Sequence, residues 1–466
     1  MPESSHTHPR TAARSAAAPR STPPIPAPRS EGTTASGKGV TPPSPSDAEP
    51  TSTESTTAPP AGPRRSTFIR YLAMMGPAFI VGAWQFGPGN LVSAVQAGSL
   101  YTYDLIWVIA LSTLLMLAFA DMSIRVGIMS SGSLVETIKK TLGKPTGVAA
   151  GLGVFSITLC FSVGNAVGSG LGLSLVLGGS PVRWTLACTV LVAAIMFARQ
   201  AYRIIEKVVL GIVALMAFSF IVTAIITKPD WIAAGTGAVV PVIPSGVGLL
   251  LVALVGTNFS LNAAFYAGYA SRERGLRRDQ YRETTIADTI PGIVAPGIMT
   301  ALVIAASAAV LSGQGGPEGA TLQQFSAVLE PLAGEAGRTI FALGFFGAAV
   351  SAMIANATAG GTLLSDGLGF GNRLSSWRVR LGVLGVLTVG ATVTVLAQGT
   401  SPVKLIIAAQ ALTVVVAPLL GILLVILSNN RRLMGDLHNK WWQNTAAAIG
   451  IVAIFATCYQ LIVTTF

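Results

Sequence analysis

The feature that most constrains this chain is a Gly-Pro-Gly cluster inside its first long apolar segment. The segment runs from about 68 to 95, and Gly87, Pro88 and Gly89 interrupt it. Proline lacks the N–H that a helix needs, and glycine weakens the helix on either side. In lipid, each broken backbone hydrogen bond costs free energy unless protein, water or solute replaces it. We therefore predict a broken helix whose backbone meets a transported solute, rather than a mere kink.

Composition places the chain among polytopic membrane proteins, since 51% of its residues are hydrophobic and only 11% are charged. The net charge of +11 comes largely from short loops between apolar segments and does not indicate nucleic-acid binding. The three cysteines lie in apolar segments without a CxxC pair, and the three histidines lie outside those segments. We expect no disulfide framework, no zinc site, no histidine proton relay and no cofactor.

The first 66 residues differ from the rest. They are rich in Ser, Thr, Pro and Ala and have almost no large apolar side chains. Such a composition cannot bury enough surface to offset the entropy of ordering. We predict a disordered cytoplasmic tail over 1–66 and a transmembrane domain over 67–466.

Eleven transmembrane spans are predicted from the apolar segments. They cover approximately 68–95, 104–128, 147–177, 182–198, 208–227, 244–270, 286–312, 338–364, 380–397, 403–427 and 444–464. A short surface helix is predicted at Ser133–Lys140, and the glycines of the third span predict close helix packing. If the N-terminus is cytoplasmic, inside loops hold 18 basic residues and outside loops hold 4. The positive-inside rule then predicts a cytoplasmic N-terminus and an external C-terminus.

A second interruption is predicted in the sixth span, where Gly256-Thr257-Asn258-Phe259-Ser260-Leu261-Asn262 is unusually polar for membrane depth. Short polar side chains bond to the local backbone and permit unwinding. The first and sixth spans are equivalent if spans 1–5 and 6–10 form two repeats, with one span left over. Five spans per half invert the second repeat relative to the first, as in secondary transporters that bind solute at two broken helices.

Several short motifs, taken together, resemble those of one transporter family. They are Gly76-Pro77, Pro88-Gly89-Asn90, Ala97-Gly98, Leu105-Ile106-Trp107, Arg125-Val126-Gly127, Tyr202 to Glu206, Asp288-Thr289, Ala357 to Leu363 and Arg431 to Gly435. Their order and spacing over about 75–461 resemble the Nramp family of divalent-metal transporters. The resemblance implies an all-α membrane protein with a LeuT-type inverted repeat of five plus five helices and one extra C-terminal helix. It also implies alternating access.

The resemblance places the substrate site at the two breaks and in the tenth span. The positions are Gly87 and Asn90 in the first break, Gly256, Asn258 and Phe259 in the second, and Gln410 in the tenth span. Gly87 replaces the family's usual aspartate, while Phe259 and Leu261 replace a methionine and a histidine. A thioether favours transition metals, and a carboxylate offsets the cost of dehydrating a divalent ion. High-affinity Mn²⁺ or Fe²⁺ binding at the usual site is therefore not expected.

Proton coupling through the third span is also not expected. Where the family carries acidic residues on a proton path, this chain has Ser162 and Asn165, which do not titrate. Asp121 is interpreted as an ion-pair partner of Arg125 at i+4 rather than as a metal ligand. Uncoupled transport, or coupling to another ion, fits the sequence better.

The predicted function is transport of a divalent metal ion across the plasma membrane. The alternative is a carrier of a small polar or charged organic solute, with Asn90, Asn258 and Gln410 as hydrogen-bond partners and Trp84, Gln85 and Phe86 nearby. Phe259 is interpreted as filling the volume of the absent methionine. A transport-inactive, receptor-like protein is a third hypothesis. No nucleophile, base and orienting group converge, so an enzyme is not expected.

Overall fold

The computed structural model describes residues 84–197, 199–313 and 322–465, all within one compact unit over 65–466. The predicted tail 1–66 and the start of the first span lie outside the described residues. The main helices are α3 (Pro88–Tyr101), α4 (Ile106–Met129), α5 (Leu134–Leu142), α6 (Lys144–Leu177), α7 (Pro181–Phe197), α8 (Arg199–Ile226), α9 (Trp231–Val239), α10 (Gly248–Asn258), α11 (Leu261–Glu273), α13 (Ile290–Leu311), α16 (Glu335–Gly367), α17 (Trp377–Leu396), α18 (Pro402–Leu412), α19 (Ala417–Asn429) and α21 (Trp441–Thr465).

Short helical segments connect them. They are η1 (Arg278–Gln280), α12 (Tyr281–Thr284), the π-helix η2 (Thr285–Thr289), α14 (Leu322–Ala327), α15 (Glu330–Ala333), η3 (Thr413–Val415), α20 (Arg431–Met434) and η4 (Gly435–Leu437). The predicted surface helix is confirmed as α5, whose N-cap Ser133 accepts a hydrogen bond from the Glu136 amide. No strand occurs among the described residues, which confirms the all-α fold class.

Seven helices in the described ranges are long and apolar enough to cross a membrane, or up to nine if each of two bent pairs forms one span. The predicted spans from the second to the eleventh each coincide with a helix or a pair of helices. The count of eleven spans stays a prediction.

Both predicted helix breaks are present. Trp84 and Gln85 are helical, Phe86 and Gly87 are not, and α3 begins at Pro88. A proline fits the first turn of a helix because its missing N–H has no partner there anyway. In the sixth span, α10 ends at Asn258 and α11 begins at Leu261.

A further bend, which the sequence analysis drew as one continuous span, separates α18 from α19 by 41°. Its cause is Pro418, which offers no N–H to the Val414 carbonyl four residues earlier. The Cys458 thiol on α21 donates to that carbonyl at 3.1 Å. The bend lies just after the last turn of α18, which carries Gln410.

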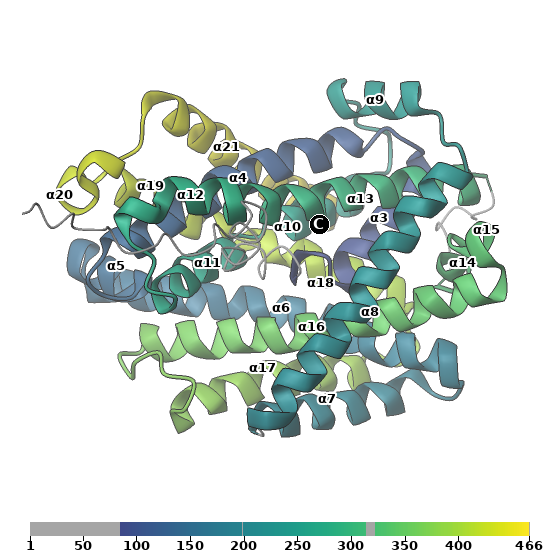
Figure 1. Cartoon of the computed structure of the whole chain (residues 1–466), viewed down its shortest axis with the longest axis horizontal. Helices are drawn as coiled ribbons and strands as arrows, with labels where there is room; N and C mark the ends of the chain where they lie inside the picture. Colours follow the sequence, from purple (N-terminus) through teal and green to yellow (C-terminus); the bar gives the residue numbers. More distant parts are fainter. Residues whose placement is uncertain (1–83, 198, 314–321, 466) are drawn as a thin grey trace, which may run out of the picture. The chain divides into compact units, whose positions relative to one another are not determined.

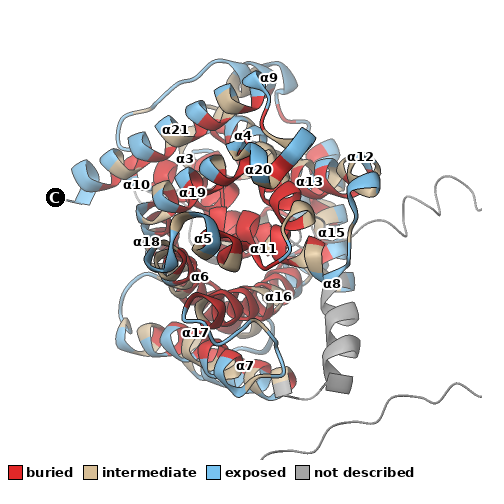
Figure 2. Cartoon of the chain, turned by 90° about the vertical axis from the view of Figure 1, so that its left-hand side faces the viewer, coloured by how far each residue is buried: buried red, intermediate tan, exposed pale blue. Residues whose placement is uncertain are grey.

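The long helices α6, α16 and α17 lie side by side, and α8 crosses them obliquely (Figure 1). Viewed from the end that carries α5 and α20, buried residues gather on α6, α11 and α16 (Figure 2). Glycines permit this packing. A Cβ on Gly168 would lie 2.6 Å from Pro88, and one on Gly172 would lie 2.7 Å from Phe346. The predicted role of these glycines in close helix packing is confirmed.

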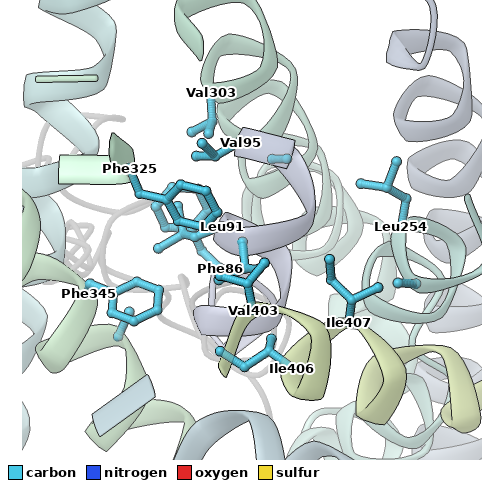
Figure 3. Close-up of a cluster of buried hydrophobic side chains, with 14 of the residues drawn as sticks. Phe86, Leu91, Val95, Leu254, Val303, Phe325, Phe345, Val403, Ile406 and Ile407 are labelled. Atoms are coloured by element: carbon cyan, nitrogen blue, oxygen red, sulfur yellow. The ribbon is translucent and has the colours of Figure 1, made fainter. Parts of the chain in front are cut away.

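The apolar core reaches the first break. Phe86, 4% exposed, belongs to a buried cluster with Leu91, Val403 and Ile406 (Figure 3). The cluster joins α3 to α18 and extends to Phe345 on α16. Phe86 therefore anchors the break in the core.

Buried polar contacts tie segments together at the end that carries α5. The Ser133 hydroxyl donates to the Asp366 carboxylate at 2.5 Å, and the Tyr269 hydroxyl donates to the same carboxylate oxygen. Lys139 also donates to the Asp366 backbone carbonyl. These bonds join α5, α11 and α16. They therefore hold α11, the second half of the broken sixth span, against its neighbours at this end.

Candidate functional site

A small cavity lies where the two broken helices meet α6 and α18. The volume that the centre of a water molecule can occupy in it is about 20 Å³. It is lined by Trp84, Gln85, Gly87, Gly89, Asn90, Phe161, Asn165, Thr257, Ser260, Ala263 and Gln410. Because a cavity holds a water molecule once this volume reaches about 10–15 Å³, the site fits one water or one small ion.

Three amides join the two breaks; we call Gln85, Asn90 and Asn258 the amide cluster. Asn90 Nδ2 donates to the Gln85 carbonyl and to Asn258 Oδ1, both at 3.2 Å. Gln85 Nε2 donates to the Asn258 carbonyl at 3.1 Å. The single proton of the Thr300 hydroxyl on α13 is shared between Asn90 Oδ1 at 3.0 Å and the Pro296 backbone carbonyl at 2.8 Å, so Asn90 Oδ1 keeps at least one further lone pair. The cluster holds the first break against the second.

Two other amides end in the cavity, and among the described residues three of their side-chain atoms have no hydrogen-bond partner. Gln410 is fully buried, and neither its Nε2 nor its Oε1 has a hydrogen-bond partner; the same holds for Asn165 Nδ2. Gln410 packs between two glycines, since a Cβ on Gly89 would lie 2.3 Å from its amide and one on Gly164 would lie 2.5 Å away. Buried amides without partners are costly, so a bound water or ion is the physical explanation for them.

Gly87 leaves room for a larger side chain. Its φ of −85° is ordinary for any residue, so the backbone does not require glycine here. A Cβ would lie 3.3 Å from Ala352 Cβ, 3.4 Å from the Trp84 carbonyl and 3.7 Å from Asn165 Oδ1. A side chain at this position would therefore adjoin Asn165 at the cavity wall after small shifts.

The cavity brings together Gly87, Asn90, Asn165 and Gln410, all of which the sequence analysis singled out. Gly256 and Phe259 line a second small cavity beside Asn262 and Thr413 instead. A Cβ on Gly256 would lie 2.7 Å from the Gln410 carbonyl, so this glycine allows α10 to approach α18.

Phe259 packs in the apolar core. Its ring meets the Phe119 ring edge to face, with 5.1 Å between centroids, and it adjoins Gly450 on α21. This packing agrees with the interpretation of Phe259 as a volume filler. Ser162 likewise lies away from the cavity, because its hydroxyl donates to the Val386 carbonyl on α17 at 2.5 Å.

Thr257 and Ser260 lie inside the predicted second break, Gly256–Asn262, but were not named as individual site residues, and Thr300 was missed altogether. Thr257 and Ser260 belong to the polar run of the second break, which could have identified them. Thr300 gave no such signal, because it is a single threonine in an apolar helix whose partner lies 210 residues away. Only the fold places it against Asn90.

The site is electrically neutral, since none of the cavity-lining residues is charged or titratable. Across residues 84–197, 199–313 and 322–465, no group of three or more His, Cys, Asp or Glu side chains is placed to hold a metal ion. The predicted pair of Asp121 with Arg125 is confirmed at 2.8 Å, on α4 and outside this lining. Any cation in the cavity would be held by neutral oxygens and by backbone carbonyls at the breaks.

Comparison with known proteins identifies relatives over most of the chain. A family model described as natural resistance-associated macrophage protein-like matches residues 78–464. A divalent metal cation transporter MntH of Klebsiella pneumoniae is 27% identical over 379 residues, covering 80% of this chain and 89% of that protein. One from Pectobacterium carotovorum is 25% identical over 396 residues, covering 84% and 94%.

Solved structures share the fold. A manganese transporter of Eremococcus coleocola superposes with a TM-score of 0.71 at 18% identity, covering 88% of this chain and 89% of that one. MhsT, solved in complex with L-phenylalanine, superposes with a TM-score of 0.54 at 16% identity, covering 82% and 98%. The predicted inverted-repeat transporter fold is confirmed by these matches.

Proposed function

Because the chain belongs to the Nramp family, we propose that it moves a divalent cation across the membrane by alternating access around the cavity at its two helix breaks. The relatives named divalent metal cation transporters support this choice of substrate class. The family match covers both breaks and α18, so the proposed site lies wholly inside the related region.

The observation that carries the proposal is a water-sized cavity with unpartnered amides at the meeting point of two broken helices. Gln410 Oε1 offers an oxygen ligand there and Asn90 Oδ1 keeps one lone pair, while the Asn165 and Gln410 amide nitrogens are donors suited to a water molecule that the ion retains. Hard divalent ions prefer oxygen ligands, and a volume of about 20 Å³ admits an ion largely freed of its water. A larger organic solute would require the cavity to open.

Neutral ligands limit affinity, because no carboxylate offsets the cost of dehydrating the ion. We expect weak binding and no preference for the softer transition metals, since no thioether lines the cavity. We also propose that transport is not proton-coupled at this site, because the lining holds no group that titrates.

The experiment is isothermal titration of the purified full-length protein with Mn²⁺, Mg²⁺ and Ca²⁺, followed by liposome uptake of each ion that binds. Saturable binding that disappears in Gln410→Leu supports the proposal. Absence of binding and uptake for all three ions by folded protein would overturn it. The leading hypothesis would then be an organic solute, for which the fold shared with the L-phenylalanine complex of MhsT is a precedent.

A substitution at Gly87 tests whether the cavity is shaped for a metal. Gly87→Asp places a carboxylate beside Asn165, and we expect Mn²⁺ to bind at least about tenfold more tightly, because a charged ligand contributes more than about 1.4 kcal/mol. Gly87→Asn has nearly the same size and no charge, so it should leave the affinity near that of the unmodified protein. Equal affinities in the two folded variants would contradict a metal site at Gly87.

We further propose that the protein lies in the plasma membrane with a cytoplasmic N-terminus and an external C-terminus. The charge bias of the loops supports this orientation. The tail 1–66 is proposed to be disordered and dispensable for transport. A truncation lacking residues 1–60 that inserts correctly should retain uptake.

A further inference from the structure

A third and larger cavity lies at the surface of the bundle. Its lining shares no residue with the linings of the two cavities at the helix breaks. It is a groove of about 610 Å³ between α4, the segment from α12 to α13, and α21. Its apolar lining includes Leu114, Leu117, Ala118, Ile290, Trp442 and Ala446. Sites for small molecules in proteins commonly have volumes of about 300–1,000 Å³, so this groove is large enough for a specific ligand.

The apolar part of the groove faces outward on helices that cross the membrane. Leu114 is 64% exposed and Ile290 is 42% exposed, and both α4 and α13 belong to candidate spans. Such side chains face lipid tails in a bilayer. The apolar part is therefore open to the hydrocarbon phase and accessible to a molecule with an acyl chain.

The other end of the groove is polar and structured by a buried ion pair. Arg125 Nε donates to Asp121 at 2.8 Å, and the Tyr281 hydroxyl donates to the other Asp121 oxygen at 2.7 Å. Arg125 also donates to the Leu437 carbonyl at 2.6 Å and to Asn439 at 2.9 Å. These bonds fix α4, α12 and the loop before α21 around the polar end.

The polar end carries one more positive than negative charge once Arg278, which pairs with Asp436 from outside the lining, is counted. Asp121 is neutralised by Arg125, and Asp436 is paired with Arg278. Lys440 is exposed, and within the described part of the chain its ammonium forms no ion pair. Tyr281 and Trp442 also line the groove, and aromatic residues of this kind are enriched at the level of the lipid headgroups.

We propose that this groove binds an anionic phospholipid from the surrounding bilayer, with its phosphate beside Lys440 and an acyl chain along Leu114, Leu117 and Ile290. Basic pockets between transmembrane helices select anionic headgroups in this way. The lipid bridges α4, α13 and α21, so its binding stabilises the folded bundle by mass action. The site is separate from the proposed transport cavity, because the two linings share no residue.

The test uses the purified full-length protein and native mass spectrometry in detergent with added phosphatidylglycerol or phosphatidylcholine of identical acyl chains. We expect phosphatidylglycerol to remain bound and to raise the thermal unfolding midpoint, and phosphatidylcholine to do neither. Lys440→Gln should weaken phosphatidylglycerol binding about fivefold, as expected for the loss of one basic side chain at an anionic headgroup. Ala446→Trp, which fills the apolar part, should also lower it.

The control is Lys144→Gln, which removes the same charge from an exposed position at the start of α6, outside the groove lining. It should retain phosphatidylglycerol as the unmodified protein does. Equal retention of both lipids, or full retention by folded Lys440→Gln and Ala446→Trp, would overturn the proposal. Displacement of the lipid by soluble glycerol phosphate alone would also overturn it, because the acyl chain would then contribute nothing.

Discussion

Gln410 illustrates how a single residue can be unfavourable for stability and suited to function. Its fully buried amide has no protein partner, and an unsatisfied buried polar group costs about 1–3 kcal/mol. We predict that Gln410→Leu raises the thermal unfolding midpoint and abolishes cation uptake. Gln96 is the matched control, because it is buried and its side chain has a partner: the Ser99 hydroxyl, shared with the Gln96 backbone carbonyl at 3.1 Å, lies 3.3 Å from its Oε1. Gln96→Leu should therefore lower the midpoint. A lower midpoint in Gln410→Leu would contradict an unsatisfied amide at this position.

At this scale the sequence identified residues whose chemistry is conspicuous and missed those whose role depends on the fold. Asn90 and Gln410 stand out because amides are costly in apolar spans. Phe259 adjoins Asn258 in sequence, yet the break turns its ring towards Phe119. Arg125, counted as a loop charge, is 2% exposed and bonds to Leu437 and Asn439 more than 300 residues away.

The two broken helices act on each other through the amide cluster. Removing Asn90 leaves the buried Asn258 Oδ1 without this donor, and removing Asn258 leaves one buried Asn90 N–H without this acceptor, so the single costs overlap. We predict that Asn90→Ala and Asn258→Ala each lower stability, and that the double variant is less destabilised than the sum by about 0.5–3 kcal/mol. The thermal unfolding of all four proteins measures this coupling. Strict additivity would show that the two breaks are energetically independent.

The elements that could be predicted from the sequence are those with a local cause. The two breaks follow from local chemistry, namely a Gly-Pro-Gly cluster and a polar run, which interrupt a helix whatever surrounds them. The bend between α18 and α19 also has a local cause in Pro418, but a proline alone indicates a kink without fixing its angle. The short helix α9 lies in a loop whose sequence gave no periodic signal.

At the scale of the whole molecule, hydrogen bonds hold α5 and α11 to α16 at one end of the bundle. The Asp366 carboxylate accepts from both Ser133 and Tyr269, and the α11 helix that carries Tyr269 contributes Ala263 of its first turn to the cavity lining. In the proposed alternating access α11 would move relative to its neighbours, and these bonds would oppose opening of the cavity towards this end. Contacts between α5, α11 and α16 join residues 97 to 233 positions apart, which sequence patterns do not predict.

We predict that Tyr269→Phe opens the cavity towards the α5 end, because a hydrogen bond to a charged group contributes about 1.5–3 kcal/mol and its loss shifts the population at least about tenfold. The measurement is the rate at which a polar thiol reagent labels Ala263→Cys in a background without the native cysteines. The matched control is Tyr103→Phe at the opposite end of the bundle. It removes the hydroxyl that accepts a hydrogen bond from the Asp230 backbone N–H at 3.0 Å. Labelling from the α5 end should rise in Tyr269→Phe and stay unchanged in Tyr103→Phe. Equal labelling rates in both variants would mean that the bonds to Asp366 hold the fold together without gating the cavity.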